Sequence, residues 1–306
     1  MGASPTTTEY LIADNLAYTE GTLHEATSTI PTRAQLISDL QHNMAIEQQS
    51  TGVPVTSWTI VDVQFHPKDG FFGVSFLTDK GNLIIAYEGT EIANTTYGNA
   101  TIAADAKILL HQTPTQLFSD VRAFAHSSEV AAKGMAGFNG NAYVTGQSLG
   151  AINAQEAAIY LNDPGNNASG VHFAGGVTFA GTGIPGYSAK ANPVANMIDY
   201  VDYGDAVGNY ASNMPAGTGN NYIPGLEPMD HVGTVVMIGQ PGSWSYTNTP
   251  AEYFAYHVLS HDADDMGCSN VYYVEPSPPF TASSFARETV DYLFSLMHPQ
   301  DLFGLG

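Results

Sequence analysis

The chain has 306 residues, 43% of them hydrophobic and 11% aromatic, which is the composition of a folded protein with a sizeable core. Eight Lys+Arg against 29 Asp+Glu give a formal net charge of −21. Such a surface repels phosphate backbones, so the charge argues against nucleic acid as a partner and favours neutral substrates.

The compartment is only weakly indicated by composition. Cys268 is the single cysteine, so an intrachain disulfide is impossible. The start, MGASPTTTEY, lacks the basic and apolar regions of a signal peptide, and no apolar run reaches the roughly 18 residues of a membrane span. Scarce lysine with abundant Gly, Asn and Ser is typical of exported bacterial proteins, so we expect a secreted protein.

The N-terminal part predicts two helices followed by a β section. Residues 10–18 are apolar on one side, and residues 33–48 place Leu36, Leu40 and Met44 on one helical stripe. Alternating or β-branched and aromatic residues then predict strands at 58–65, 71–77 and 83–87.

The remainder alternates strands with helices. Residues 90–115 are polar and predict an irregular segment, and the next helix, 116–133, closes at Gly134. Further strands are expected at 141–145, 171–180, 197–201 and 232–238, and a last helix at 281–297. This order predicts an α/β protein with a largely parallel sheet, and we expect one domain over 1–306.

The segment NAYVTGQSLGAINAQEAAIYLND (141–163) contains a G-x-S-x-G pattern between the expected strand and a helical run. Glycines on both sides give room for a sharp strand-to-helix turn, and Ser148 would project at the helix N-terminus. Backbone N–H groups there point toward a developing oxyanion. The alternative is a serine that merely caps the helix.

A nucleophilic serine needs a base, and the base needs an orienting acid. Downstream carboxylates lie in NMIDYVDYGDAVGNY, where Asp205 follows the expected strand and Asp199 and Asp202 lie within it. The later histidines are His231, His257, His261 and His298.

Five segments in order resemble the class 3 lipases of the α/β-hydrolase superfamily. They are LIIAYEGT (83–90), VTGQSLGA (144–151), VTFAGTGIPG (177–186), DYVDYGDAV (199–207) and DHVGTVVMIG (230–239). The resemblance covers about residues 10 to 265, and it implies an α/β-hydrolase fold with a mostly parallel central sheet flanked by helices.

The resemblance also implies roles for particular residues. Ser148 would be the nucleophile and Asp205 the orienting acid, with Thr90 and the N–H of Leu149 forming the oxyanion hole. The base would be His257, 52 residues after Asp205.

The choice of base stays open. His261 is the alternative to His257, because residues four apart share a face if the segment is helical. His231 belongs to the H-V-G segment, which is structural in the family.

Departures from the family pattern point to a distant, bacterial branch. Gln147 replaces the usual His before the serine, and Ala151 replaces a Gly. Glu88 stands where the family has Arg, which puts the support of the oxyanion loop in doubt. Residues 91–114, where the family carries its lid, place Ile102, Ala106, Leu109 and Leu110 on one side of a helix.

The expected function is hydrolysis of carboxylic esters through an acyl-enzyme, as in a triacylglycerol lipase, phospholipase A1 or esterase. The substrate would be an ester or lipid, with the lid segment opening at an interface. No cofactor and no metal are expected, since Asp262, Asp264 and Asp265 are more typical of a solvated face than of a calcium site. The alternative is a catalytically silent α/β-hydrolase domain used for binding.

Overall fold

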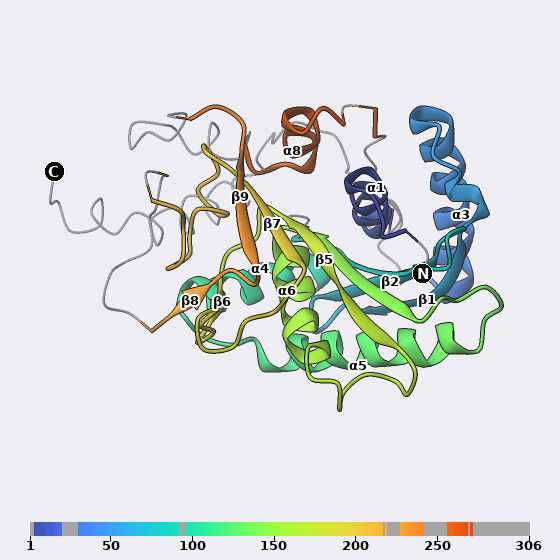
Figure 1. Ribbon diagram of the computed structural model, residues 1–306, viewed down its shortest axis with the longest axis horizontal. Helices are drawn as coiled ribbons and strands as arrows, with labels where there is room; N and C mark the ends of the chain where they lie inside the picture. The colour runs from blue at the N-terminus through green and yellow to red at the C-terminus, as the bar shows by residue number, and fades with distance from the viewer. Residues whose placement is uncertain are drawn as a thin grey trace, which may run out of the picture.

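The computed structural model describes residues 3–19, 30–91, 96–216, 218, 227–241, 256–268 and 270–271. Its central feature is a seven-stranded sheet of order β1-β2-β3-β4-β5-β7-β9 (Figure 1). The strands are β1 (Thr59–His66), β2 (Phe71–Leu77), β3 (Leu83–Tyr87), β4 (Asn141–Gln147), β5 (His172–Phe179), β7 (Met197–Asp202) and β9 (Thr234–Ile238).

The sheet is mixed. Strands β1, β2 and β3 form an antiparallel meander, and the ladder from β3 through β4, β5 and β7 to β9 is parallel. A separate antiparallel pair joins β6 (Ile184–Pro185) to β8 (Met229–Asp230). Because the five parallel strands end at the same edge, loops that follow them meet there.

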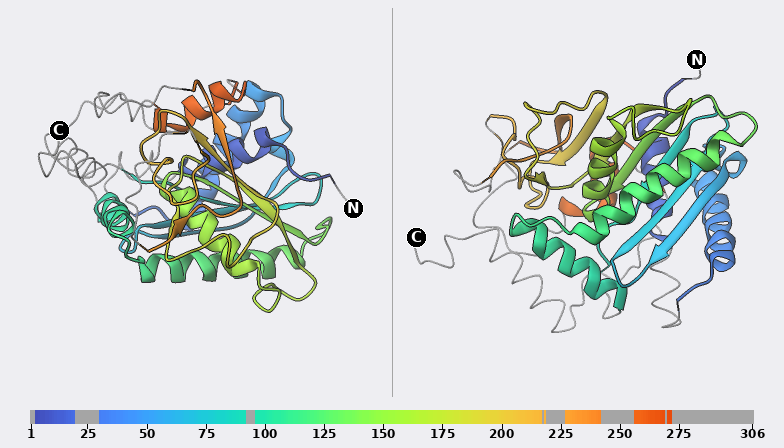
Figure 2. Two further views of the ribbon diagram at one scale, coloured as in Figure 1. Left: turned by 60° about the vertical axis from the view of Figure 1, so that its left-hand side comes forward. Right: turned by 90° about the horizontal axis from the view of Figure 1, so that it is seen from below.

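Helices cover both faces of the sheet (Figures 1 and 2). The helices are α1 (Thr7–Ala17), α3 (Arg33–Thr51), α4 (Thr96–Leu109), α5 (Thr115–Lys133), α6 (Leu149–Leu161) and α8 (Leu259–Asp265), with a short 3-10 turn η1 (Val55–Ser57). Helices α5 and α6 pack on one face, and α1, α3 and α8 pack on the other. The layers are those of an α/β-hydrolase-like fold, as the sequence predicts.

Two apolar cores result from strand alternation. Phe71 and Ile85 point to the α5–α6 side, while their neighbours Phe72 and Ile84 point to the α1–α3 side. All four side chains are almost completely buried. A strand that is buried on both faces has a nearly continuous apolar sequence instead of alternating apolar and polar residues, and β2 and β3 have such sequences.

Most elements match their predicted positions. Strands β2 and β3 have the predicted bounds, and the others agree within a few residues. The expectation of an irregular segment over 90–115 is wrong, because α4 occupies Thr96–Leu109, which includes most of the helical stretch expected in the lid-like segment. Its polar residues lie among alanines at helix-favouring positions, and one side packs on the core through Ala104 and Ile108. The helix expected at 281–297 lies outside the described residues.

None of the described helices combines the length and the apolar character needed to cross a membrane.

Candidate active site

The turn between β4 and α6 places Ser148 in an unusual backbone conformation. Its φ of 57° and ψ of −125° lie in a region that few residues other than glycine adopt. A Cβ at Gly146 would lie 2.2 Å from the carbonyl oxygen of Gly150, and one at Gly150 would lie 2.2 Å from that of Tyr87. Both glycines are therefore required by close backbone approach, as the nucleophile-elbow pattern predicts.

Three of the predicted residues lie in mutual contact. Ser148 Oγ is 2.8 Å from His257 Nε2, and His257 Nδ1 is 3.1 Å from each carboxylate oxygen of Asp205. Ser148 directly follows β4, and Asp205 lies three residues after β7, so both lie at the carboxyl edge of the parallel strands. His257 lies two residues before α8. This is the geometry in which an imidazole can take a proton from a hydroxyl while a carboxylate fixes its tautomer.

Two backbone N–H groups bind the carboxylate of Asp205. It is fully buried, and it accepts hydrogen bonds from the backbone N–H groups of Val207 (2.8 Å) and Gly208 (3.0 Å). These two hydrogen bonds fix the position of the carboxylate that faces His257.

His261 does not contact Ser148. Its Nε2 lies 3.6 Å from Asp202 Oδ2 and 3.3 Å from Asp265 Oδ2. His257 and His261 do not lie on one continuous helix, because Val258 between them is extended (φ −83°, ψ 142°) and α8 starts only after it. His298 lies outside the described residues.

The sequence did not predict a pair of hydrogen bonds that connects Tyr18, Gln147 and the backbone of His257. Gln147 accepts a hydrogen bond from Tyr18 Oη at 2.5 Å and donates its amide to the backbone carbonyl of His257. Gln147, which stands where the family has a His, thus connects the turn after β4 to the segment before α8. Nothing in the local sequence around Tyr18 indicates this contact, because the two residues lie 129 positions apart.

The predicted oxyanion residues lie beside the elbow. Leu149 is buried and begins α6, directly after Ser148. A Cβ at Gly89 would lie 2.8 Å from the carbonyl oxygen of Gln147, so the loop carrying Thr90 packs tightly against the elbow. Thr90 Oγ1 donates a 2.5 Å hydrogen bond to Asp105 of α4.

Asp105 and Glu88 connect this loop to α4. Burial raises the pKa of Asp105 to about 7, although the hydrogen bond from Thr90 and the nearby His257 oppose the rise. Glu88 is buried and accepts a 2.8 Å hydrogen bond from the hydroxyl of Tyr97 in α4. The departure at Glu88 therefore has a local partner, and the loop is supported through α4 instead of through an arginine.

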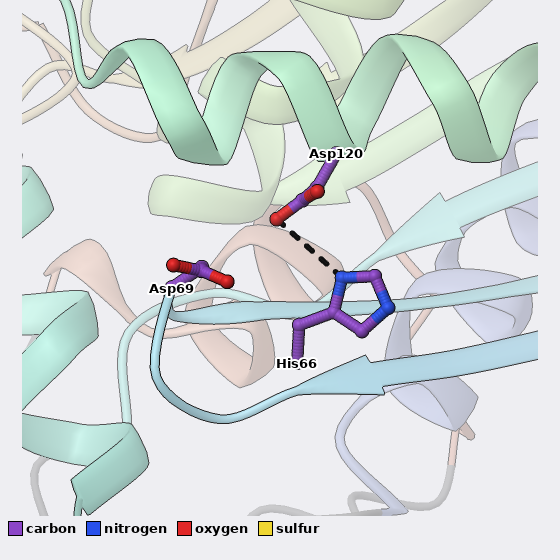
Figure 3. A group of neighbouring side chains, drawn as sticks. All are labelled: His66, Asp69 and Asp120. Carbon is purple, nitrogen blue, oxygen red and sulfur yellow. Dashed lines mark ion pairs between the residues drawn. The ribbon is translucent and has the colours of Figure 1, made fainter.

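Two groups among the described side chains have the spacing of metal ligands. One is Asp202, His261 and Asp265, next to α8; the other is His66, Asp69 and Asp120, between the β1–β2 turn and α5 (Figure 3). In each group an imidazole already lies against a carboxylate, at 3.3 Å for His261 and Asp265 and at 3.4 Å for His66 and Asp120. In each group the carboxylate therefore has a histidine as a partner without a metal ion.

The acidic run before Cys268 is solvated in part, as its sequence suggests. Asp264 and Asp265 are exposed, but Asp262 is fully buried, and its burial together with neighbouring carboxylates raises its pKa well above the usual range. Burial and the adjacent Asp265 also raise the pKa of Asp202, to about 8. A raised pKa favours the neutral form, so Asp262 and Asp202 add less negative charge to this region than two ordinary carboxylates would.

Comparison with known proteins supports the fold and leaves the sequence family open. No family model matches the sequence, and no curated protein matches it. The chain is similar in structure to M37 lipase, with a TM-score of 0.55, 13% identity, and coverage of 96% of this chain and 100% of that chain.

Two further lipase structures show lower scores. The Rhizomucor miehei lipase propeptide complex has a TM-score of 0.46 at 14% identity, covering 78% of this chain and 71% of that one. The lipase from Rhizopus microsporus var. chinensis has a TM-score of 0.40 at 12% identity, covering 86% and 88%. At such identities the likeness to M37 lipase establishes the fold alone, and the chemistry must be argued from the site.

Proposed function

We propose that this protein is a serine hydrolase that cleaves carboxylic esters through an acyl-enzyme, and that it is a distant bacterial member of the class 3 lipases. The observation that carries the proposal is the 2.8 Å contact between Ser148 Oγ and His257 Nε2, with Asp205 3.1 Å from the other ring nitrogen. The family assignment rests on the five ordered segments together with the fold.

In the proposed reaction, His257 takes the hydroxyl proton of Ser148 as its Oγ attacks the ester carbonyl carbon. The resulting oxyanion is stabilised by the backbone N–H groups of Leu149 and Thr90, since the hydroxyl of Thr90 already donates to Asp105. His257 then gives the proton to the leaving alcohol, and the C–O bond of the ester breaks. Water attacks the acyl-enzyme by the same steps, which releases the acid and restores the serine. Loss of one oxyanion donor would raise the barrier by about 3 kcal/mol.

The proposed substrate is a neutral ester or lipid. A net charge of −21 disfavours anionic ligands, and the resemblance to the class 3 lipases assigns the lid to residues 91–114. The side of α4 that packs on the core carries Tyr97 and Ile108, whereas Leu110, just beyond the helix, is 48% exposed. An exposed apolar side chain in the lid-like segment suits contact with a lipid surface.

A lid role for this segment can be tested separately from the chemistry. Leu110→Asp is expected to lower activity on an emulsion several-fold while leaving a short soluble ester unaffected. Equal effects on both substrates would reject the lid and leave the hydrolase proposal intact.

The test of the chemistry is labelling with a fluorophosphonate probe together with hydrolysis of a short p-nitrophenyl ester. Wild type should label at Ser148 and hydrolyse the ester, and Ser148→Ala and His257→Ala should do neither. His261→Ala is the matched control, since this imidazole lies four residues away and pairs with Asp202 and Asp265 instead. A wild type that neither labels nor hydrolyses, with and without detergent, would favour a silent binding domain.

A further inference from the structure

A second buried Asp–His pair lies next to Gly208, in the loop that carries Asp205. Asp199 of β7 and His231, which follows β8, are both completely inaccessible to solvent. His231 Nδ1 forms an ion-pair contact with Asp199 Oδ2, and Thr178 Oγ1 donates a 2.9 Å hydrogen bond to the other oxygen of Asp199. Neither member of the pair takes part in the chemistry proposed above.

The pair is connected to Asp205 through a single residue. His231 Nε2 lies 2.9 Å from the carbonyl oxygen of Gly208, and the N–H of Gly208 donates to Asp205 Oδ2 at 3.0 Å. Gly208 is thus held on one side by His231 and holds the carboxylate on the other.

Gly208 has no side chain with which to anchor itself. A Cβ there would lie 2.7 Å from Asp205 Oδ2 and 2.8 Å from Val201 Cγ1, so the close approach to the carboxylate requires glycine. Glycine has the greatest backbone freedom of any residue, so its position depends on the groups that bind its backbone. The imidazole of His231 is such a group, and it is rigidly buried.

The chemistry of the ring fits this task. One nitrogen faces a carboxylate and the other a carbonyl, and both of these accept hydrogen bonds. The nitrogen that faces the carbonyl of Gly208 must carry the hydrogen, and Asp199 holds the ring from its other nitrogen.

We propose that His231 is a positioning residue, which fixes Gly208 and thereby the direction in which Asp205 faces His257. The proposal rests on the proposed function, because it assigns His231 a part in keeping the Ser148–His257–Asp205 contacts in order. Its effect should appear in kcat and not in substrate binding.

Two substitutions separate the contacts of the ring. His231→Asn puts an amide nitrogen near the place of Nδ1, so it can keep the contact to Asp199 and loses the one to Gly208. His231→Gln puts an amide nitrogen near the place of Nε2, so it keeps the contact to Gly208. Val232→Ala is the matched control, since it removes buried methyl groups from the next residue and leaves both contacts in place.

The first readout is ester hydrolysis with melting temperatures measured alongside. His231→Asn is expected to lower kcat about 10- to 100-fold at unchanged KM, the range that a small misplacement of a catalytic group produces. His231→Gln should keep kcat within about threefold of wild type, and Val232→Ala within about twofold, although all three should melt earlier. Losses of kcat that simply follow the loss of melting temperature would overturn the proposal.

A substitution of the partner guards against a variant that does not fold. In Asp199→Asn the amide oxygen can still accept the hydrogen bond from Thr178, and the amide nitrogen can donate to His231 Nδ1, so a neutral ring keeps its hydrogen on Nε2, toward Gly208. Asp199→Asn should therefore keep kcat within about threefold of wild type, and a kcat loss like that of His231→Asn would overturn the proposal.

The second readout needs no substrate and so separates the two proposals. The proton between His257 Nδ1 and Asp205 should give a far-downfield proton resonance in wild type, His231→Gln and Val232→Ala. Its loss in His231→Asn supports the positioning role even if wild type hydrolyses no ester, an outcome that would reject only the proposed function. An unchanged resonance in His231→Asn would overturn the positioning role even if wild type is active.

Discussion

Replacing Asp105 by asparagine is expected to stabilise the protein increasingly as the pH rises. Burial raises the pKa of this carboxyl from 3.8 to about 7. Below pH 4 it is protonated in both the folded and the unfolded chain and contributes no difference. As the pH rises from 4 to 7 the unfolded chain loses the proton first, so the folded state loses stability, and the loss is complete above pH 7.

The size of the effect follows from the same values. Each pKa unit between the folded and unfolded states is worth about 1.4 kcal/mol, which gives a ceiling of about 4 kcal/mol. Asp105 retains partial access to solvent, so we expect about half of this, or about 2 kcal/mol. Asparagine cannot ionise, yet its amide oxygen can still accept the hydrogen bond from Thr90, so the comparison isolates the charge.

Urea unfolding of wild type and Asp105→Asn between pH 5 and pH 9 measures this difference. More than half of the change falls in that window, so the variant should gain about 1 kcal/mol relative to wild type across it. Asp79→Asn, in the exposed β2–β3 turn, is the control and should show no such trend. A constant difference between Asp105→Asn and wild type would refute the reasoning.

Three other substitutions test the packing and electrostatics of the site. Gly150→Ala, whose Cβ would lie 2.2 Å from the carbonyl oxygen of Tyr87, should lose about 3 kcal/mol in urea unfolding; a loss under about 1 kcal/mol would contradict the close packing. Gln147→Ala removes the hydrogen bond to the backbone of His257, so kcat for a p-nitrophenyl ester should fall about tenfold at constant KM; unchanged kcat would mean that this hydrogen bond is dispensable. Asp202, with its pKa raised to about 8, should make Asp202→Asn gain stability over wild type with rising pH and level off about one pH unit later than in the first prediction, and a plateau at lower pH would argue against the raised pKa.

The sheet could be predicted from the sequence because each strand is bounded by a recognisable turn. The pair at 71–77 and 83–87 has apolar runs separated by Asp79-Lys80-Gly81-Asn82, and the structure has strands with those bounds. Helix α4 was predicted only in part, within the lid-like segment, because the polar residues around it obscure the alanines that favour it.

The site was less accessible, because its contacts join distant segments. Ser148 and Asp205 could be placed from their local patterns of strand and turn. The choice between His257 and His261 depends on the extended backbone at Val258, which the apolar pattern does not reveal. The contact of Tyr18 with the elbow has no local signal at all, since it forms only when α1 packs on the sheet.

The backbone at Ser148 carries an evolutionary consequence. Its φ of 57° with ψ of −125° is open to glycine but costs another residue about 1–3 kcal/mol. The fold would thus be more stable with glycine there. In a descendant without selection for catalysis, replacement of Ser148 by glycine would stabilise the fold and should therefore be common. Descendants that keep Ser148 are therefore expected to be those that still use it.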